Sequence, residues 1–185
     1  PVVDAIIQVS SALSVVPEHP ARTFREALQS IHFYVFCLWD LYFFGRVDQY
    51  LLPYYEADLE AGRLTEAEAL ELFDCLMILS AHYITPLSVQ VVTVGGRDPE
   101  GRPVSNALTR IALASVAHAR VQVAQTALLV RRDMEEELLR MAVDLLAEGY
   151  SQPQLYNDDL IAASLRARGF PEPVCHDYAN CGCVE

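Results

Sequence analysis

The chain has 185 residues, of which 52% are apolar and 21% charged, and its formal net charge is −12. This composition is typical of one globular domain with a real core and excludes a disordered chain. The acidic balance argues against nucleic-acid binding, which needs basic patches. All 13 basic residues are arginine, which excludes lysine chemistry such as a Schiff base or a P-loop.

The five cysteines are an odd number, and no signal peptide opens the chain, so a reducing, cytoplasmic setting is expected. The most apolar stretch, 31–44, contains His32 and Asp40 and is too short to span a bilayer, so no membrane segment is expected. The sequence starts at Pro1 without a methionine and stops at Cys-Val-Glu. We therefore expect a piece of a longer polypeptide.

The first part of the chain, about 1–82, predicts helices. A short apolar stretch covers 3–16. Thr23 and Glu26 fit a capping box, which predicts a helix to about Phe44 that is apolar nearly all round and hence deeply buried. Gly45 is expected to end it.

A short helix is expected after Pro53, and Thr65 is expected to cap a strong helix over 66–82, whose apolar residues recur at helical spacing. From there the pattern alternates between strands and helices. The strands are predicted at 87–94, 120–130 and 153–157, and the helices at 104–118, 133–148, 158–168 and 171–178. This alternation predicts βαβ units with a buried parallel sheet, hence an α/β fold.

Reactive side chains gather at the C-terminal end, residues 175–185, and three interpretations compete there. The cysteines could be small buried residues of a loop. Cys175, His176, Cys181 and Cys183 could bind zinc, although their spacing is poor for a structural site. Thirdly, Gly182 would expose a reactive Cys183, and Glu185 would share its face in an extended loop.

Several separated segments decide between these interpretations, because in their order they resemble the glycyl radical enzyme family. The segments are Pro20–Gln29, Gly45-Arg46-Val47-Asp48-Gln49-Tyr50-Leu51-Leu52-Pro53-Tyr54-Tyr55, Gly62–Leu72, Thr93-Val94-Gly95-Gly96 with Asn106, Gln125–Arg131, Gln152–Asp158 and Gly182-Cys183-Val184-Glu185. Together they span residues 20–185. A lone G-C-V-E would carry no weight, but this series is highly specific.

The resemblance implies part of a ten-stranded β/α barrel, namely the first half-barrel with flanking helices. It divides residues 1–185 into a helical region of about 1–82, strand and helix units over about 87–178, and a catalytic cysteine loop at 179–185. The family's C-terminal R-V-x-G-[YF] motif, which carries the radical, is absent from this sequence. The glycyl radical domain is therefore expected outside this chain, which alone would be inactive.

The resemblance also implies the chemistry. Cys183 would carry a thiyl radical, and Glu185 would be the base that takes a proton from a substrate hydroxyl, so that water, an amine or sulfite is eliminated. An oxygen-sensitive, anaerobic lyase of the dehydratase type is expected. Arylacetate decarboxylases and formate acetyltransferase-like carbon–carbon lyases of the same family stay open, as do a non-catalytic barrel remnant and a zinc-binding module.

The resemblance further implies a small-molecule substrate, a radical SAM activating enzyme as partner, and a homodimer at full length. No cofactor and no metal would bind to this chain itself.

Some residues depart from the family's pattern or allow a structural interpretation. Thr126 stands where the family usually has proline, and Cys181 where most members have an apolar residue. Asp40, in an aromatic segment, could contact substrate, although hydrogen-bonded structure is the more common role. Three groups are expected to be structural: Asp48, Gln49 and Tyr50 as hydrogen-bonding ties, Cys37 and Cys75 as core residues, and His82 and His118 as surface or capping residues.

Overall fold

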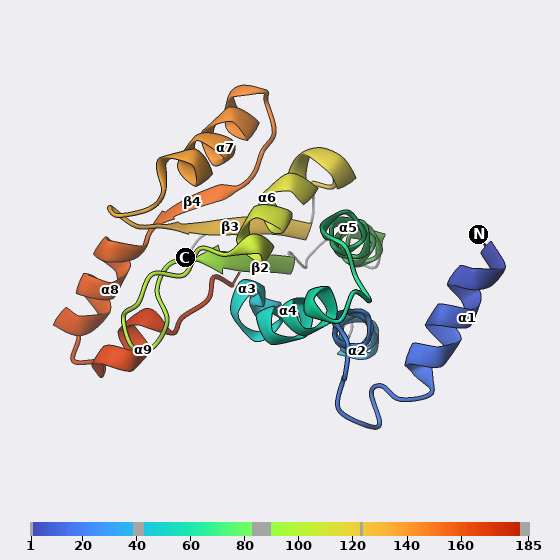
Figure 1. Ribbon diagram of the computed structural model, residues 1–185. Coiled ribbons are helices and arrows are strands. Elements are labelled where there is room, and N and C mark those ends of the chain that lie inside the picture. Colours follow the sequence, from blue (N-terminus) through green and yellow to red (C-terminus); the bar gives the residue numbers. More distant parts are fainter. Residues whose placement is uncertain (1, 39–42, 83–89, 123, 182–185) are drawn as a thin grey trace.

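The computed structural model describes residues 2–38, 43–82, 90–122 and 124–181. Its centre is a four-stranded, all-parallel sheet in the order β1-β2-β3-β4 (Figure 1). The strands are β1 (Gly45–Arg46), β2 (Gln90–Gly95), β3 (Ala124–Val130) and β4 (Gln154–Asn157). The expected α/β class with a parallel sheet is confirmed.

The register places one residue of each strand on a common row across the sheet. Arg46 is paired with Thr93, Thr93 with Ala127, and Ala127 with Gln154. Residues on such a row point to the same face, because side chains alternate between faces along every strand. Residues from all four strands therefore share one face at this level.

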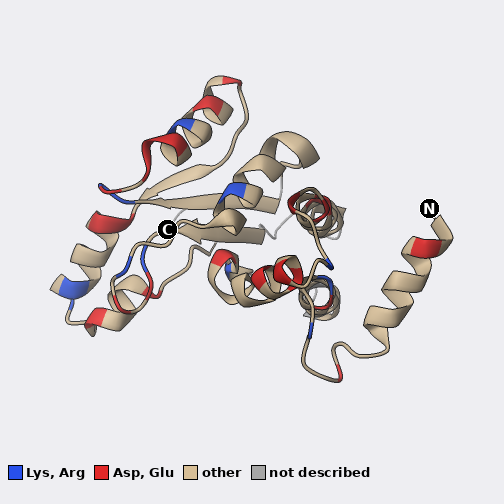
Figure 2. Ribbon diagram, in the orientation of Figure 1, with Lys and Arg blue, Asp and Glu red and all other residues tan. Residues whose placement is uncertain are grey.

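Helices surround the sheet and connect its strands. They are α1 (Val2–Leu13), α2 (Phe24–Leu38), α3 (Val47–Tyr50), α4 (Leu52–Glu60), α5 (Glu66–His82), α6 (Ala107–Ala119), α7 (Glu136–Ala147), α8 (Asp158–Ala167) and α9 (Glu172–His176). The first helix stands at one side, beyond α2, α4 and α5 (Figure 1). Acidic residues are spread over α4, α5, α7 and α8 on both sides of the molecule (Figure 2).

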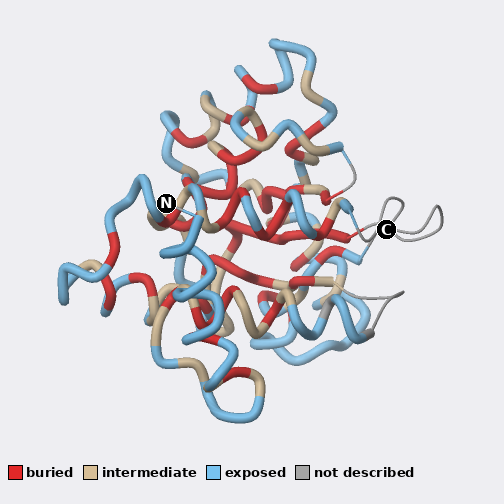
Figure 3. The backbone as a smooth tube through the Cα atoms, turned by 90° about the vertical axis from the view of Figure 1, so that its right-hand side faces the viewer, coloured by how far each residue is buried: buried red, intermediate tan, exposed pale blue. Residues whose placement is uncertain are grey.

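The main core lies between the sheet and the helices that cover one of its faces. Val92 and Val94 of β2 and Leu128 of β3 belong to a buried cluster that also contains Phe73 of α5 and Leu113 of α6. Buried positions concentrate in the sheet and in the helix surfaces that face it (Figure 3). The strong helix expected after Thr65 is confirmed as α5, which begins at Glu66 and ends at His82.

The opposite face of the sheet is formed by the alternate residues of the same strands, and we call it the inner face. Val91, Thr93, Ala127 and Leu129 lie there, and each is fully buried. None of these four belongs to the helix-side cluster. The sheet is therefore buried on both faces, as the apolar strand sequences predict for a parallel sheet.

The prediction of a helix to about Phe44 is wrong at its end. The last helical residue described is Leu38, Phe43 and Phe44 are not helical, and Gly45 begins β1 instead of ending a helix. The N–H of Phe44 donates to the carbonyl of Val91 (3.0 Å), so this segment joins the sheet. A strand of two residues is too short to give a periodic pattern.

The burial expected for two sets of residues is also wrong. Phe33, Tyr34 and Phe36 of α2 are exposed, because no described element covers that side of the helix. Cys37 and Cys75, expected in the core, are exposed as well. Within the described residues, no helix is both long and apolar enough to cross a membrane.

Candidate active site

The last described residues, 177–181, pass from the carboxyl end of the sheet onto its inner face. The N–H of Asn180 donates to Oγ1 of Thr93 in β2 over 3.1 Å, and both residues are buried. Binding sites of parallel α/β sheets lie at the carboxyl ends of the strands. The described part of the predicted cysteine loop therefore docks where this architecture places its chemistry.

Arg46, at the end of β1, binds this segment through a buried guanidinium group. Nη1 donates to the carbonyl of His176 (2.9 Å) and to that of Tyr178 (3.4 Å). Nη2 donates to the carbonyls of Gly95 (2.5 Å) and Arg97 (3.0 Å), in the turn after β2. One side chain thus joins the C-terminal segment to the end of the neighbouring strand.

Asp48 is buried beneath the same turn. Its Oδ2 accepts from the N–H of Gly95 (2.7 Å) and from the hydroxyl of Thr109 (2.8 Å). Burial raises the pKa of this carboxyl group to about 6, although both hydrogen bonds act in the opposite direction. The hydroxyl of Tyr50 donates to the carbonyl of Phe44 (2.8 Å). The hydrogen bonds expected of Asp48 and Tyr50 are therefore present.

The turn after β2 requires glycine twice. Both Gly95 and Gly96 have positive φ, at 79° and 69°. A Cβ on Gly95 would lie 2.9 Å from the carbonyl oxygen of Leu129, and one on Gly96 would lie 2.9 Å from Cδ1 of the same leucine. Both glycines therefore form a tight turn, and close packing against β3 explains why neither position has a side chain.

Tyr178 ties the segment to the far side of the sheet. Its hydroxyl donates to Oδ1 of Asp158 over 2.7 Å, at the point where β4 passes into α8. Asp158 is fully buried. Burial, followed by the bond to Asp158, raises the pKa of Tyr178 well above its usual range. The tyrosine is therefore neutral at physiological pH and serves as a fixed hydrogen-bond donor.

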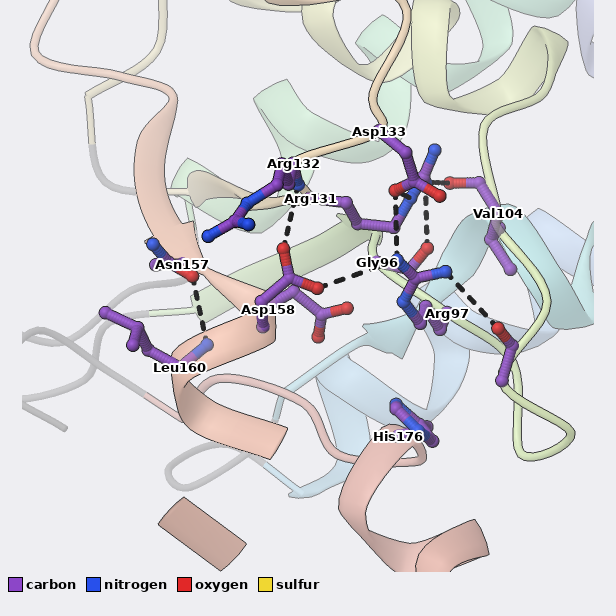
Figure 4. Close-up of polar contacts among 12 residues, drawn as sticks. Gly96, Arg97, Val104, Arg131, Arg132, Asp133, Asn157, Asp158, Leu160 and His176 are labelled. Carbon is purple, nitrogen blue, oxygen red and sulfur yellow. Dashed lines mark hydrogen bonds and ion pairs between the residues drawn. The ribbon is translucent and has the colours of Figure 1, made fainter. Parts of the chain in front are cut away.

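Two further arginines organise the carboxyl ends of β2 and β3 (Figure 4). The buried Arg131 donates from Nη1 to the carbonyl of Gly96 (2.9 Å) and from Nε to Asp133 (3.1 Å). Arg97 donates to Asp133 (3.0 Å) and also lies 3.5 Å from Asp159. These guanidinium groups lower the pKa of Asp133, although the partial burial of this carboxyl group is the largest single influence and acts in the opposite direction. They hold the strand ends together, and within the described part of the chain neither guanidinium group bonds to residues 177–181.

A row of polar side chains crosses the inner face beside this segment. Nε2 of Gln154 donates to Oε1 of Gln125 (2.7 Å), and the hydroxyl of Tyr156 donates to Oε1 of Gln154 (2.9 Å). Gln154 lies on the row of the sheet that also contains Thr93. All three polar residues are partly buried. This face therefore offers hydrogen-bonding groups as well as apolar ones.

The residues predicted to carry the chemistry, Cys183 and Glu185, lie outside the described residues, and so does Asp40. Sequence reasoning missed Arg46 and Thr93, although both belong to segments that carried the family resemblance. The one feature of the sequence that could have pointed to Arg46 is its position two residues before Asp48, a buried acid. Its role depends on partners 130 positions away, which periodicity does not reveal.

The other cysteines of the C-terminal region have different settings. Cys175 is fully buried in α9, and its Sγ lies 3.5 Å from the carbonyl oxygen of Phe170. Cys181 is exposed. His118, predicted at the surface, is largely exposed and its Nδ1 contacts the carboxyl group of Asp74.

Comparison with known proteins places this arrangement in a family. A family model described as pyruvate formate lyase-like matches residues 3–185. Isethionate sulfite-lyase of Nitratidesulfovibrio vulgaris is 34% identical over 189 residues, which cover 92% of this chain and 23% of that protein.

Solved structures agree. A structure that concerns 1,2-propanediol dehydration in Roseburia inulinivorans matches with a TM-score of 0.86 at 32% identity, covering 95% of this chain and 24% of that one. A glycyl radical enzyme from Archaeoglobus fulgidus has the same fold, with a TM-score of 0.88 at 22% identity over 98% of this chain and 26% of its own. The chain spans about a quarter of the length of these relatives. It belongs to the pyruvate formate lyase-like family of glycyl radical enzymes.

Proposed function

We propose that this chain carries the thiol and the base of a radical lyase that eliminates water, an amine or sulfite from a small hydroxylated substrate. Cys183 is the thiol and Glu185 the base. One observation supports the proposal above the others: residues 176–180 are tied to β1, β2 and the start of α8 by hydrogen bonds. Three residues span at most about 10 Å, so the proposal requires the substrate to bind within that reach of Asn180.

The proposed cycle regenerates the thiyl radical, because the hydrogen atom taken from the substrate is returned to the product. The thiyl radical of Cys183 takes a hydrogen atom from the substrate carbon that bears the hydroxyl group. Glu185 takes the hydroxyl proton, and the leaving group departs from the neighbouring carbon with the electron pair of its bond. The product radical then takes the hydrogen atom back from the Cys183 thiol. The net change is loss of the leaving group and one proton, with formation of a carbonyl group.

In this family the glycyl radical would first abstract the hydrogen atom from the thiol, which generates the thiyl radical. The described residues fit such a partner, because the segment before Cys183 lies on the inner face and Asn180 is buried there against Thr93. A radical relay needs this exclusion of water, which also strengthens the polar interactions inside the site. We further propose that a radical SAM enzyme installs the radical and that the full-length protein is a cytoplasmic homodimer.

The test is a pair of cysteine variants in the full-length, activated protein. Cys183→Ser should abolish product formation from isethionate or 1,2-propanediol, because an O–H bond is too strong for a glycyl radical to break. Cys181→Ser is the matched control two residues away and should retain much of the activity. Release of sulfite or formation of aldehyde is measured, together with the radical content by electron paramagnetic resonance.

Substantial turnover by Cys183→Ser would show that the thiol lies elsewhere. Loss of turnover in Cys181→Ser alone would assign the thiyl radical to Cys181. Turnover on neither substrate by a wild-type protein that holds a full radical signal would count against these two leaving groups and call for a wider series of hydroxylated substrates.

A further inference from the structure

Arg46 is buried, and no carboxylate among the described residues makes a hydrogen bond to its guanidinium group. The guanidinium of Arg46 donates to four backbone carbonyl groups, two in the C-terminal segment and two in the turn after β2. Burying a charge is costly unless hydrogen bonds replace water. Backbone carbonyls fix positions of the chain, so this arrangement holds two segments in one geometry.

The register of the sheet shows how Arg46 acts together with a residue of the next strand. Arg46 and Thr93 are paired across β1 and β2, and both bind the segment that leads to the predicted cysteine. Arg46 binds it at His176 and Tyr178, and Thr93 binds it at Asn180. The segment is therefore held at successive points on two neighbouring strands, and Cys183 follows three residues later.

Arginine is suited to this task in a way that lysine is not. Its planar group presents five N–H donors in a fixed fork, whereas an ammonium group is a compact charge with three rotating donors. Arg46 uses both terminal nitrogens, one toward each segment. Lysine could keep the charge but could not bind both segments with the same geometry.

We propose that Arg46 is a positioning residue for Cys183, because it fixes the segment 176–180 on the inner face and thereby sets the place of the thiol. This inference rests on the proposed function. It predicts that loosening the bond at Arg46 moves the thiol without unfolding the sheet. Displacement of a reacting group by about 1 Å can lower a rate by about 10²-fold.

Arg131, directly after β3, provides a matched control two strands away from β1. It is also a buried arginine, and its Nη1 donates to the carbonyl groups of Gly96 and Val104 in the same turn region. Among the described residues, its guanidinium group makes no bond to residues 176–181. Arg131→Lys should therefore lower stability about as much as Arg46→Lys without loosening the C-terminal segment.

The experiment compares Arg46→Lys, Arg46→Gln and Arg131→Lys in the full-length protein. Hydrogen–deuterium exchange before activation reports directly on the N–H of Asn180, and it does not depend on turnover. We expect exchange in peptides covering 176–181 to accelerate by about tenfold or more in the Arg46 variants, and to be unchanged in Arg131→Lys. Melting temperatures record the loss of stability in each variant.

After activation, kcat of Arg46→Lys should fall by about 10- to 100-fold, while KM changes by less than about threefold and the radical signal is kept. Unchanged exchange together with unchanged kcat in Arg46→Lys would overturn the proposal. So would a kcat that falls in both Arg46→Lys and Arg131→Lys in proportion to their melting temperatures. Failure of both Arg46 variants to fold, with Arg131→Lys folded, would assign Arg46 to the stability of the sheet and would overturn it too.

Failure of the proposed function has a different signature. It would appear in the wild-type protein, as a radical signal without elimination from any hydroxylated substrate. Failure of the inference appears only in the Arg46 variants, as exchange at 176–181 that matches an active wild type.

Discussion

Asp48 is the residue whose titration should be visible in the stability of the protein. Burial raises its pKa from 3.8 to about 6, so between about pH 4 and pH 6 the folded chain holds a proton that the unfolded chain has released. Stability should therefore fall as pH rises through this window, and should not change further above it. One pKa unit corresponds to about 1.4 kcal/mol, which makes the full loss about 3 kcal/mol at most.

Asp48→Asn should flatten this dependence, because an amide keeps an oxygen for the N–H of Gly95 and does not ionise. Urea unfolding at several pH values between 4 and 7.5 measures it. Asp133→Asn is the control, since the pKa of this more exposed carboxyl group is lowered and its contribution is lost only as pH falls. A fall in stability between pH 4 and pH 6 that survives in Asp48→Asn would assign it to another group.

Glu185 can be tested separately from Cys183. Glu185→Gln preserves size but removes the base, and hydrogen abstraction by the thiyl radical does not strictly need that base. In the full-length, activated protein, exchange of hydrogen between substrate and solvent should persist. Product formation should fall by about 10²–10⁴-fold, the usual contribution of general acid–base catalysis.

The control is Glu172→Gln on the exposed side of α9, which pairs with Arg166 and should leave turnover within about twofold. Undiminished product formation in Glu185→Gln would make this residue structural and favour a carbon–carbon lyase. Joint loss of exchange and product would mean that Glu185 positions substrate for the first step.

Thr126 shows how one departure from the family's pattern is accommodated. A proline at this position would have no N–H to satisfy. The N–H of Thr126 instead donates to Oε1 of Gln152 (2.7 Å), and Nε2 of the same glutamine donates to the carbonyl of Val121 (2.6 Å). A buried donor is thus paired by a side chain from the segment before β4, so the change is compatible with the strand.

At the scale of elements, the N-cap residue of α6, Asn106, both caps the helix and binds the backbone of Asp48 beside the site. Oδ1 of Asn106 accepts from the N–H groups of Leu108 (2.9 Å) and Thr109 (3.2 Å), while its Nδ2 donates to the carbonyl of Asp48 (2.7 Å). Aspartate is as good an N-cap as asparagine in isolated helices. Here Asn106→Asp should destabilise the protein by about 1–3 kcal/mol, because it leaves a carboxylate against a buried carbonyl oxygen.

The same substitution at the N-cap of α8 is the control. Asn157 is exposed, and its side chain accepts from the N–H of Leu160 (3.0 Å). Asn157→Asp keeps that bond and should change stability by no more than about 0.5 kcal/mol. Both variants are compared by chemical unfolding at neutral pH. Equal effects of the two substitutions would show that Asn106 acts only as a cap.

At the scale of the whole molecule, the sheet is buried on one face by α5 and α6 and receives residues 177–181 on the other. Some surfaces have no described cover. Val2, Val3, Ile6 and Ile7 of α1 are more than half exposed, and β4 is an edge of the described sheet. Exposed apolar patches and strand edges of this kind mark surfaces that other segments or chains can cover.

Local patterns determined much of this fold. The apolar spacing after Thr65 gave the bounds of α5, and the alternation of strands and helices gave a parallel α/β sheet, because both depend on neighbours within a few residues. The same approach failed for the end of α2 and for the two residues of β1, where periodicity has too few positions to act. It also overestimated burial at Cys37 and Cys75, since a helix sequence does not reveal which of its sides is covered.

The family and its motifs could likewise be recognised from the sequence, because they are runs of adjacent residues. The tertiary structure decided which residues of those motifs contact one another. The register of β1 and β2 places Arg46 beside Thr93, and the path of the chain after α9 brings Tyr178 and Asn180 to them. Such contacts join residues that are far apart in sequence, and their geometry depends on strand register and packing, so only the folded chain specifies them.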